Sequence, residues 1–457
     1  MNILFVSLGC DKNLVDSEVM LGLIREKGYQ ITDDEKEADI IVVNTCCFIN
    51  DAKEESINTI LEMAEYKKTG SLKGLIVTGC LGQRYKEDIQ KEINEVDAIL
   101  GTSNYDEIVS VMEGVLEGKR TVSVKEPEAI GQVKTSRINT TGGYFSYLKI
   151  AEGCDKHCTY CIIPKIRGNY RSIPMERLLE EAEGLVQSGV KELILVAQET
   201  TLYGKDIYGE KTLPKLLREL CKIEGLEWIR ILYSYPEEIT DELIEVIKSE
   251  DKICKYLDMP IQHASNDILK RMGRRTNQAE LIHIVNKLRD KIPDIVLRTT
   301  LITGFPGETE EEHGELKEFL TKMKFDRLGV FTYSKEDDTP AAKMKKQIHK
   351  HIKKRRQAEI MELQQNIAFE HAKDMAGKKL KVMIEGKLPE DSLAEQSILN
   401  QAQLISSGNI YIGRTYMDAP NVDGYIFVQA RGELMSGKFV EVMVTDAKEY
   451  DLIGKLI

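Results

Sequence analysis

The first hundred residues repeat one pattern three times: an apolar, β-branched run, then a cysteine, then a helical pattern. The runs cover residues 3–6, 40–43 and 75–77, and the helical patterns cover residues 16–27, 56–66 and 85–93. Fully apolar runs of this kind are typical of strands buried inside a parallel sheet. Strands that alternate with helices predict an open α/β sheet, which leaves few other folds for this region.

Each predicted strand ends in a short loop that carries a cysteine. These residues, Cys10, Cys46 and Cys80, lie 36 and 34 positions apart. The carboxyl ends of parallel strands share one edge of the sheet, where ligands bind, so the three thiols can meet there. The alternative is three thiols with only a packing role, since free cysteine is among the most buried residues. The repetition at one place favours a shared site. Cys47 is expected to point away from Cys46 and to be structural.

A second set of cysteines, Cys154, Cys158 and Cys161, has the spacing CxxxCxxC. A closed zinc site requires four ligands, and a bacterial ferredoxin uses a tighter CxxC run with a further cysteine. No fourth cysteine is near, because Cys221 and Cys254 lie in unrelated surroundings. Three thiolates on a four-iron cluster leave one iron open, which indicates chemistry rather than electron storage. His157 is interpreted as a loop residue rather than a ligand.

Six further strand–helix units follow. The predicted strands cover residues 144–150, 192–197, 229–233, 256–261, 294–302 and 327–332, and the helices include 175–187, 213–223, 241–248 and 278–290. Six such units predict an open partial barrel, with its site at the carboxyl ends of the strands. Polar residues at these ends are candidate ligand contacts, although many such residues have no functional role. They are Gln198, Glu199, Ser234, Gln262, His263, Arg298, Thr300 and the loop glycine Gly304. Thr309 and Glu312 predict a capping box.

The CxxxCxxC loop, with the aromatic Tyr160 before its last cysteine, resembles the radical S-adenosylmethionine (SAM) enzymes. The resemblance implies that the open iron binds the amino and carboxylate groups of SAM. It also implies that reduction of the cluster cleaves SAM and yields a 5′-deoxyadenosyl radical. The residues expected to contact SAM are Tyr160, Gln198, Ser234, Gln262, Arg298 and Gly304.

Two cysteine sets in one chain resemble the methylthiotransferases, which replace a C–H bond with C–SCH3. The resemblance implies two 4Fe-4S clusters and two SAM molecules spent per product. The cluster on Cys154, Cys158 and Cys161 would generate the radical, and the one on Cys10, Cys46 and Cys80 would hold the sulfur.

Three stretches, residues 7–18, 198–204 and 413–420, resemble the branch that modifies the β-carbon of an aspartate of small-subunit ribosomal protein S12. The tRNA-modifying members usually have Gln-Met-Asn or Lys-Val-Asn after the first cysteine, where this chain has Asp11-Lys12-Asn13. The chain departs from the family at Cys47, where glycine is usual, and at Glu199, where aspartate is usual. The alternatives are a tRNA adenosine methylthiotransferase and a non-catalytic iron–sulfur carrier. An electron donor such as a flavodoxin or ferredoxin and a sulfur donor are expected partners.

Residues 343–356 are strongly basic, and a helix is expected from there to about residue 376. A solvated linker helix is the favoured interpretation over an RNA-contacting patch. Beyond residue 377, short alternating strands at 380–384, 425–428 and 439–444 resemble a TRAM domain, a small OB-like β-barrel. The acidic stretch 418–423 suits an encounter with a basic ribosomal protein. Residues 386–409 are predicted to form a surface excursion.

Composition sets outer limits on the function. The chain has 457 residues, a length that suggests about three domains, placed at 1–125, 140–375 and 376–457. Its net charge of −12 argues against a protein that coats nucleic acid non-specifically. No apolar run is long enough for a membrane span. We expect a cytoplasmic enzyme of α/β class with reduced cysteines.

Overall fold

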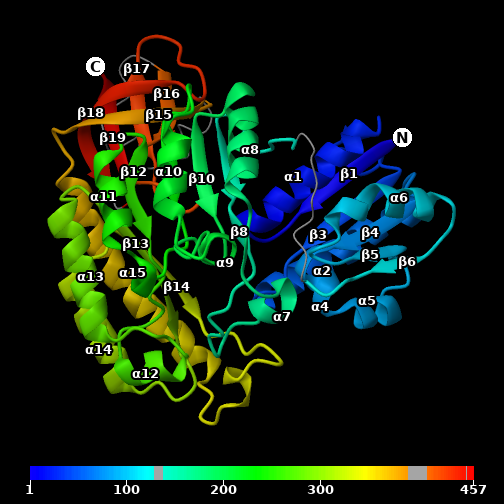
Figure 1. The fold of residues 1–457 in the computed structure, drawn as a ribbon, viewed down its shortest axis with the longest axis horizontal. Helices are drawn as coiled ribbons and strands as arrows, with labels where there is room; N and C mark the ends of the chain where they lie inside the picture. Colours follow the sequence, from blue (N-terminus) through cyan, green and yellow to red (C-terminus); the bar gives the residue numbers. More distant parts are fainter. Residues whose placement is uncertain (128–136, 390–408, 449) are drawn as a thin grey trace.

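The computed structural model describes residues 1–127, 137–389, 409–448 and 450–457. It contains two six-stranded parallel sheets and a closed five-stranded barrel. Figure 1 shows the first sheet in blue beside the second, with the small barrel in red at one end of the second sheet. The predicted fold class is therefore confirmed. Among the described residues, no helix combines the length and apolar character that crossing a membrane requires.

The first sheet has the strand order β2-β1-β3-β4-β5-β6. The three predicted strands are β1 (Asn2–Ser7), β3 (Ile40–Thr45) and β4 (Gly74–Thr78), and they are confirmed. Sequence analysis missed β2 (Gln30–Thr32), β5 (Ala98–Leu100) and β6 (Thr121–Ser123), which are too short to show a periodic pattern. One apolar core lies between the sheet and helices α1 (Asp11–Glu26) and α6 (Ile108–Leu116). A second core lies against α2 (Asn50–Ala64) and α5 (Lys86–Glu92).

Two predictions for this region are wrong. Helix α1 begins at Asp11 and not at residue 16, because its first turns bury polar side chains such as Lys12 and Asn13 and show no apolar period. Cys80 lies in the first turn of α4 (Gly79–Arg84) and not in a loop. The cysteine still follows the carboxyl end of β4 directly, so its predicted place at the edge of the sheet is unchanged.

The second sheet has the order β14-β13-β12-β11-β10-β7, and every neighbouring pair is parallel. The six predicted strands are confirmed as β7 (Phe145–Lys149), β10 (Glu192–Val196), β11 (Trp228–Ile231), β12 (Ile253–Asp258), β13 (Val296–Thr303) and β14 (Arg327–Thr332). The apolar core lies between these strands and helices α8 (Met175–Gln187), α10 (Leu213–Cys221), α11 (Asp241–Ser249), α13 (Gln278–Lys291) and α14 (Glu310–Met323). Thr309 and Glu312 form the predicted capping box at the start of α14.

The basic segment differs from its prediction. Helix α15 (Lys350–Lys373) begins seven residues after position 343. It is not a solvated linker throughout, because Arg356 is buried and pairs with Glu308 at 3.0 Å. Lys353 donates a hydrogen bond to the Tyr333 carbonyl at 2.6 Å. The helix is therefore packed against β14, the edge strand of the second sheet.

The closed barrel has the order β15-β16-β17-β19-β18. Its strands are β15 (Lys379–Lys387), β16 (Asn409–Arg414), β17 (Ile426–Ala430), β18 (Phe439–Lys448) and β19 (Asp451–Leu456). The predicted excursion 386–409 is wrong at its two ends, which belong to β15 and β16; residues 390–408 lie outside the described residues.

Two carboxylates of the acidic stretch before β17 form contacts within the protein. Asp418 binds Arg327 at 2.6 Å, and both side chains are buried. Asp423 accepts a hydrogen bond from the Tyr256 hydroxyl at 2.7 Å and lies 3.4 Å from Arg298. The interpretation of these two carboxylates as a docking surface for a basic protein is therefore wrong, since they face the second sheet.

A buried ion pair also joins the small barrel to the second sheet. Glu192, at the start of β10, accepts from Arg230 at 2.8 Å and from Arg414 of β16 at 2.7 Å, and all three side chains are fully buried. The two guanidiniums lower the pKa of Glu192 against the opposing effect of burial. Arg414 also binds Glu385 of β15 at 2.6 Å, so two carboxylates balance the two arginines across this boundary.

Glu192→Ala is expected to lower the free energy of unfolding by roughly 3–5 kcal/mol, because it leaves the buried Arg230 without its carboxylate, while Arg414 keeps Glu385. Thermal and urea unfolding followed by circular dichroism measure the change. Glu227→Ala is the matched control, since Glu227 pairs with Lys381 across the same boundary at 2.8 Å but in solvent. It should cost less than about 1 kcal/mol. Equal losses in the two variants would contradict the assignment.

Candidate active site

The first cysteine set lies at the carboxyl ends of β1, β3 and β4. Gly9, just before Cys10, has φ +91°, and a Cβ there would lie 2.7 Å from the Cys46 Cβ and 3.1 Å from its Sγ. Only glycine allows the two cysteine loops to approach this closely. Burial raises the pKa of Cys80, and the charges of Cys46 and Cys10 raise it further. The structure therefore brings the three predicted thiols together.

Asn13 connects all three of these cysteine loops. Its Nδ2 donates to the carbonyls of Leu8 at 3.1 Å and Thr45 at 2.9 Å, directly ahead of Cys10 and Cys46. Its Oδ1 lies 3.8 Å from the Cys80 Sγ. The side chain is fully buried, so this amide fixes the relative positions of the loops. Sequence analysis did not single out Asn13, although its place three residues after Cys10 was a usable signal.

Cys47 is close to Cys80, because both belong to one apolar cluster and the charge of Cys47 raises the pKa of Cys80. It is completely buried and packs in the apolar core on the α2 side of the sheet. Burial raises its pKa to about 12. These surroundings fit the interpretation of Cys47 as a structural residue.

The second set lies on the loop between β8 (Ala151–Glu152) and α7 (Ile163–Arg167). Backbone hydrogen bonds hold the loop, among them Cys154 N–H to the Gly168 carbonyl at 3.1 Å. Burial raises the pKa of Cys154 to about 11, and the charge of Cys158 adds to this. Burial and the charges of Cys158 and Cys154 raise the pKa of Cys161 as well. His157 is exposed, in agreement with its interpretation as a loop residue.

The donor chemistry of both sets fits iron–sulfur clusters better than single ions. Within the described residues, no three cysteine, histidine or acidic side chains surround one position for a metal ion. A cubane binds each thiolate through a different iron, so its ligands lie further apart than those of one ion. Buried thiols with raised pKa values also require a strong positive charge for deprotonation, which bound iron supplies. In the second set, three cysteines without a nearby fourth match a cluster with one open iron; in the first set, Cys47 lies next to Cys46 but in the apolar core.

The segment after β11 reaches both sets. The Tyr233 hydroxyl donates to Asp11 at 3.1 Å, and the Lys12 ammonium lies 3.3 Å from the centre of the Tyr233 ring. Two residues further on, burial and the charge of Cys158 raise the pKa of Tyr235. The two cysteine sets therefore lie at the same end of the second sheet, on either side of this segment.

Four of the predicted SAM contacts lie near the second set or at strand ends. Tyr160 is next to Cys158, and its pKa is raised by burial and by that thiol. Gln198 donates to Glu152 at 2.8 Å. Within the described part of the chain, the buried Gln198 Oε1 and Ser234 Oγ have no hydrogen-bond partner, so both can bind a polar ligand. The Gln262 backbone N–H donates to the Thr300 carbonyl at 2.9 Å.

The other two predicted contacts are engaged with the protein. Arg298 binds Asp258 at 2.8 Å and also faces Asp423. The Gly304 N–H donates to the Glu308 carboxylate at 2.5 Å, and a Cβ at Gly304 would lie 3.1 Å from the Lys353 Cβ. The close approach at Gly304 is therefore to α15. As SAM contacts, Arg298 and Gly304 stay predictions.

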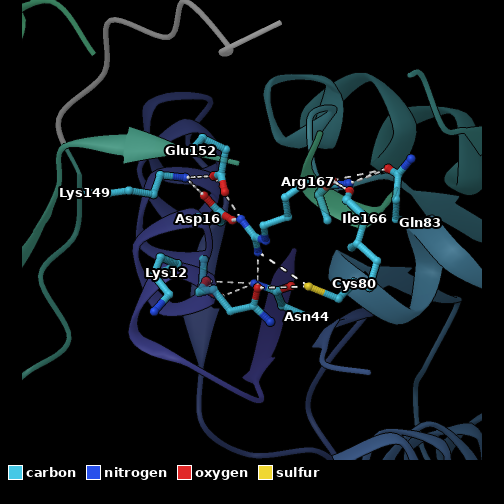
Figure 2. A network of polar contacts seen from close by, with 12 residues as sticks. Lys12, Asp16, Asn44, Cys80, Gln83, Lys149, Glu152, Ile166 and Arg167 are labelled. Atoms are coloured by element: carbon cyan, nitrogen blue, oxygen red, sulfur yellow. Dashed lines mark hydrogen bonds and ion pairs between the residues drawn. The ribbon is translucent and has the colours of Figure 1, made fainter. Parts of the chain in front are cut away.

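A buried charge network joins the first sheet to the second (Figure 2). Lys149 at the end of β7 binds Asp16 of α1 and, at 2.8 Å, Glu152. Arg167 of α7 binds the same two carboxylates, Asp16 at 3.0 Å and Glu152 at 2.9 Å. Sequence analysis missed this network, because its members come from four elements and form no local motif.

Comparison with known proteins gives the class. The profile of the radical SAM superfamily matches residues 148–320, and that of the TRAM domain matches residues 376–457. Residues 2–101 match the profile described as "Uncharacterized protein family UPF0004". The solved radical SAM methyltransferase TsrM from Kitasatospora setae is similar in fold, with a TM-score of 0.55 and 14% identity over 83% of this chain and 80% of that one. The chain contains a radical SAM domain, the class that uses a 4Fe-4S cluster and SAM.

Full-length relatives define the family more narrowly. The chain is 71% identical, over 99% of both chains, to the protein from Lachnoclostridium phytofermentans named ribosomal protein uS12 methylthiotransferase RimO. It is 48% identical to the protein of the same name from Clostridioides difficile, over 99% of this chain and 98% of that one. The chain belongs to the ribosomal protein uS12 methylthiotransferase family.

Gly9→Ala is expected to remove the iron of the first set, about half of the total, because its Cβ would displace Cys46. Iron and sulfide are measured after anaerobic reconstitution. Gly28→Ala is the matched control at the other end of α1, since Gly28 also has positive φ but no atom near its Cβ position. It should cost about 1–2 kcal/mol of stability and keep its iron. Full iron in Gly9→Ala would contradict the assignment.

Proposed function

We propose that this protein adds a methylthio group to the β-carbon of an aspartate of ribosomal protein uS12 by radical SAM chemistry. The observation that carries the proposal is the placement of two three-thiol sets at one end of the second sheet, joined by Tyr233 and Tyr235. The names of the full-length relatives support uS12 as the substrate. The tRNA adenosine alternative is not favoured, since the full-length relatives named above carry the uS12 name.

We infer two resident 4Fe-4S clusters, one on Cys154, Cys158 and Cys161 and one on Cys10, Cys46 and Cys80. When bound, the cluster on Cys154, Cys158 and Cys161 would supply the electron that cleaves SAM, and the cluster on Cys10, Cys46 and Cys80 would present the sulfur. Gln198 and Ser234 offer buried oxygens that have no hydrogen-bond partner among the described residues and can orient a polar ligand beside the second sheet. The Lys12 ammonium lies over the Tyr233 ring, 3.3 Å from its centre, next to the first cysteine set.

The remaining partners follow from the chemistry. Reduction requires a low-potential electron donor, such as a flavodoxin or ferredoxin, and renewal of the transferred sulfur requires a sulfur donor. We propose that residues 1–125, 140–375 and 376–457 act as three domains of one cytoplasmic enzyme. The first would present sulfur and the second would generate the radical.

The test uses two triple variants. The triple variant with Ala at Cys154, Cys158 and Cys161 should form no 5′-deoxyadenosine from SAM under reducing conditions. The triple variant with Ala at Cys10, Cys46 and Cys80 should still cleave SAM but transfer no methylthio group. Each should retain about half of the iron, because each keeps one cluster. Mass spectrometry of purified uS12 and of tRNA, incubated separately, identifies the substrate.

Cys221→Ala is the control, because Cys221 ends α10 away from both sets and its loss should leave iron and activity unchanged. Modification of tRNA instead of uS12 would overturn the substrate. Wild-type protein that forms no 5′-deoxyadenosine would support the non-catalytic carrier instead.

A further inference from the structure

Arg167 follows the second cysteine set in sequence, but its guanidinium contacts the first set, Cys10, Cys46 and Cys80, at Cys80. It is the last residue of α7, six positions after Cys161, and only 2% of it is exposed. Its Nη2 donates to the Asn13 Oδ1 and lies 3.7 Å from the Cys80 Sγ, within hydrogen-bond reach of sulfur. Figure 2 shows the side chain reaching across to Cys80. One arginine therefore touches a predicted ligand of the opposite site.

The surrounding charges direct this contact. Arg167 and Lys149 contribute two positive charges, and Asp16 and Glu152 contribute two negative ones. The four groups balance without a contribution from Cys80. The Nη1 side of the guanidinium is held by the two carboxylates, so the Nη2 side is fixed toward Asn13 and Cys80. A thiolate at Cys80 would add negative charge where an N–H donor already points.

Neighbouring residues hold α7 in this position. The Ile166 carbonyl accepts a hydrogen bond from the Thr102 hydroxyl at 3.0 Å, and Thr102 in turn donates its backbone N–H to Gln83 at 3.0 Å. Asn13, which receives the Arg167 hydrogen bond, is the residue that connects the three cysteine loops. The position of Arg167 is therefore set from both sides of the boundary between the two sheets.

We propose that Arg167 is a positioning residue of the Cys10, Cys46 and Cys80 site, which holds the Cys80 sulfur by an N–H···S hydrogen bond and raises the reduction potential of the cluster bound there. Hydrogen bonds to ligand sulfurs and local charge are among the factors that set such potentials. Reduction adds negative charge to the cluster, and a buried guanidinium stabilises that charge. The inference rests on the proposed function, which places a cluster on Cys10, Cys46 and Cys80.

The test measures the midpoint potential of that cluster alone, in the full chain with Cys154, Cys158 and Cys161 changed to Ala. Potentials are followed by anaerobic redox titration with electron paramagnetic resonance detection. Arg167→Gln should lower the equilibrium constant for reduction at least tenfold, which is about 59 mV for one electron. Arg167→Lys keeps the charge but cannot bond both Asn13 and Cys80, so it should give a smaller shift in the same direction.

Two controls separate the contact from its surroundings. Lys149→Gln removes a positive charge from the same network without touching a cysteine. Arg84→Gln removes another arginine that bridges the two parts, through Glu336 at 3.1 Å. Both should shift the potential less than Arg167→Gln does. Equal shifts in Arg167→Gln and Lys149→Gln would overturn the direct contact in favour of a general charge effect.

The outcomes also distinguish this inference from the function on which it rests. If the background protein binds a cluster and Arg167→Gln leaves its potential unchanged, only the role of Arg167 is overturned. If the protein with Cys154, Cys158 and Cys161 changed to Ala binds no iron, the proposed cluster on Cys10, Cys46 and Cys80 is overturned, and the inference with it. If Arg167→Gln loses its cluster, the shift in Arg167→Lys decides, and an unchanged potential there overturns the proposal.

Discussion

Buried ion pairs between different parts of the chain hold this protein together. Glu192 is compensated by arginines from the second sheet and from the small barrel. Asp16 of the first sheet is compensated by Lys149 and Arg167 of the second. An unpaired charge in such places costs several kcal/mol. The pairs therefore fix the parts in one arrangement, and that arrangement sets the relation between the two cysteine sets.

Much of the fold could be predicted because its strands are buried on both faces. β3 and β10 each contain four consecutive apolar residues, at 40–43 and 193–196, and the order of such strands with the intervening helices left few topologies. The first residues of the helices were harder to predict from the sequence. Helix α1 buries Lys12, Asn13 and Asp16 in its first turns, and a polar face that packs against another part of the chain shows no apolar period.

The cysteines could be identified from their spacing and their repeated position after strands. The residues that surround them could not, because contacts such as Arg167 to Cys80 or Tyr233 to Asp11 join positions far apart in sequence. The acidic stretch near Asp418 was misinterpreted for the same reason. Its composition suggested an external partner, but Arg327, the partner in the structure, lies 91 residues away.

The small barrel has one further consequence. Its apolar residues, among them Met417 and Ala419, share a core with the inner-face side chains of the second sheet, such as Tyr147, Ile194 and Tyr256. A module packed into that concave face cannot swing out as a tethered arm to collect a macromolecule. The barrel is fixed against the second sheet, so a target protein must approach a surface whose shape the barrel does not change.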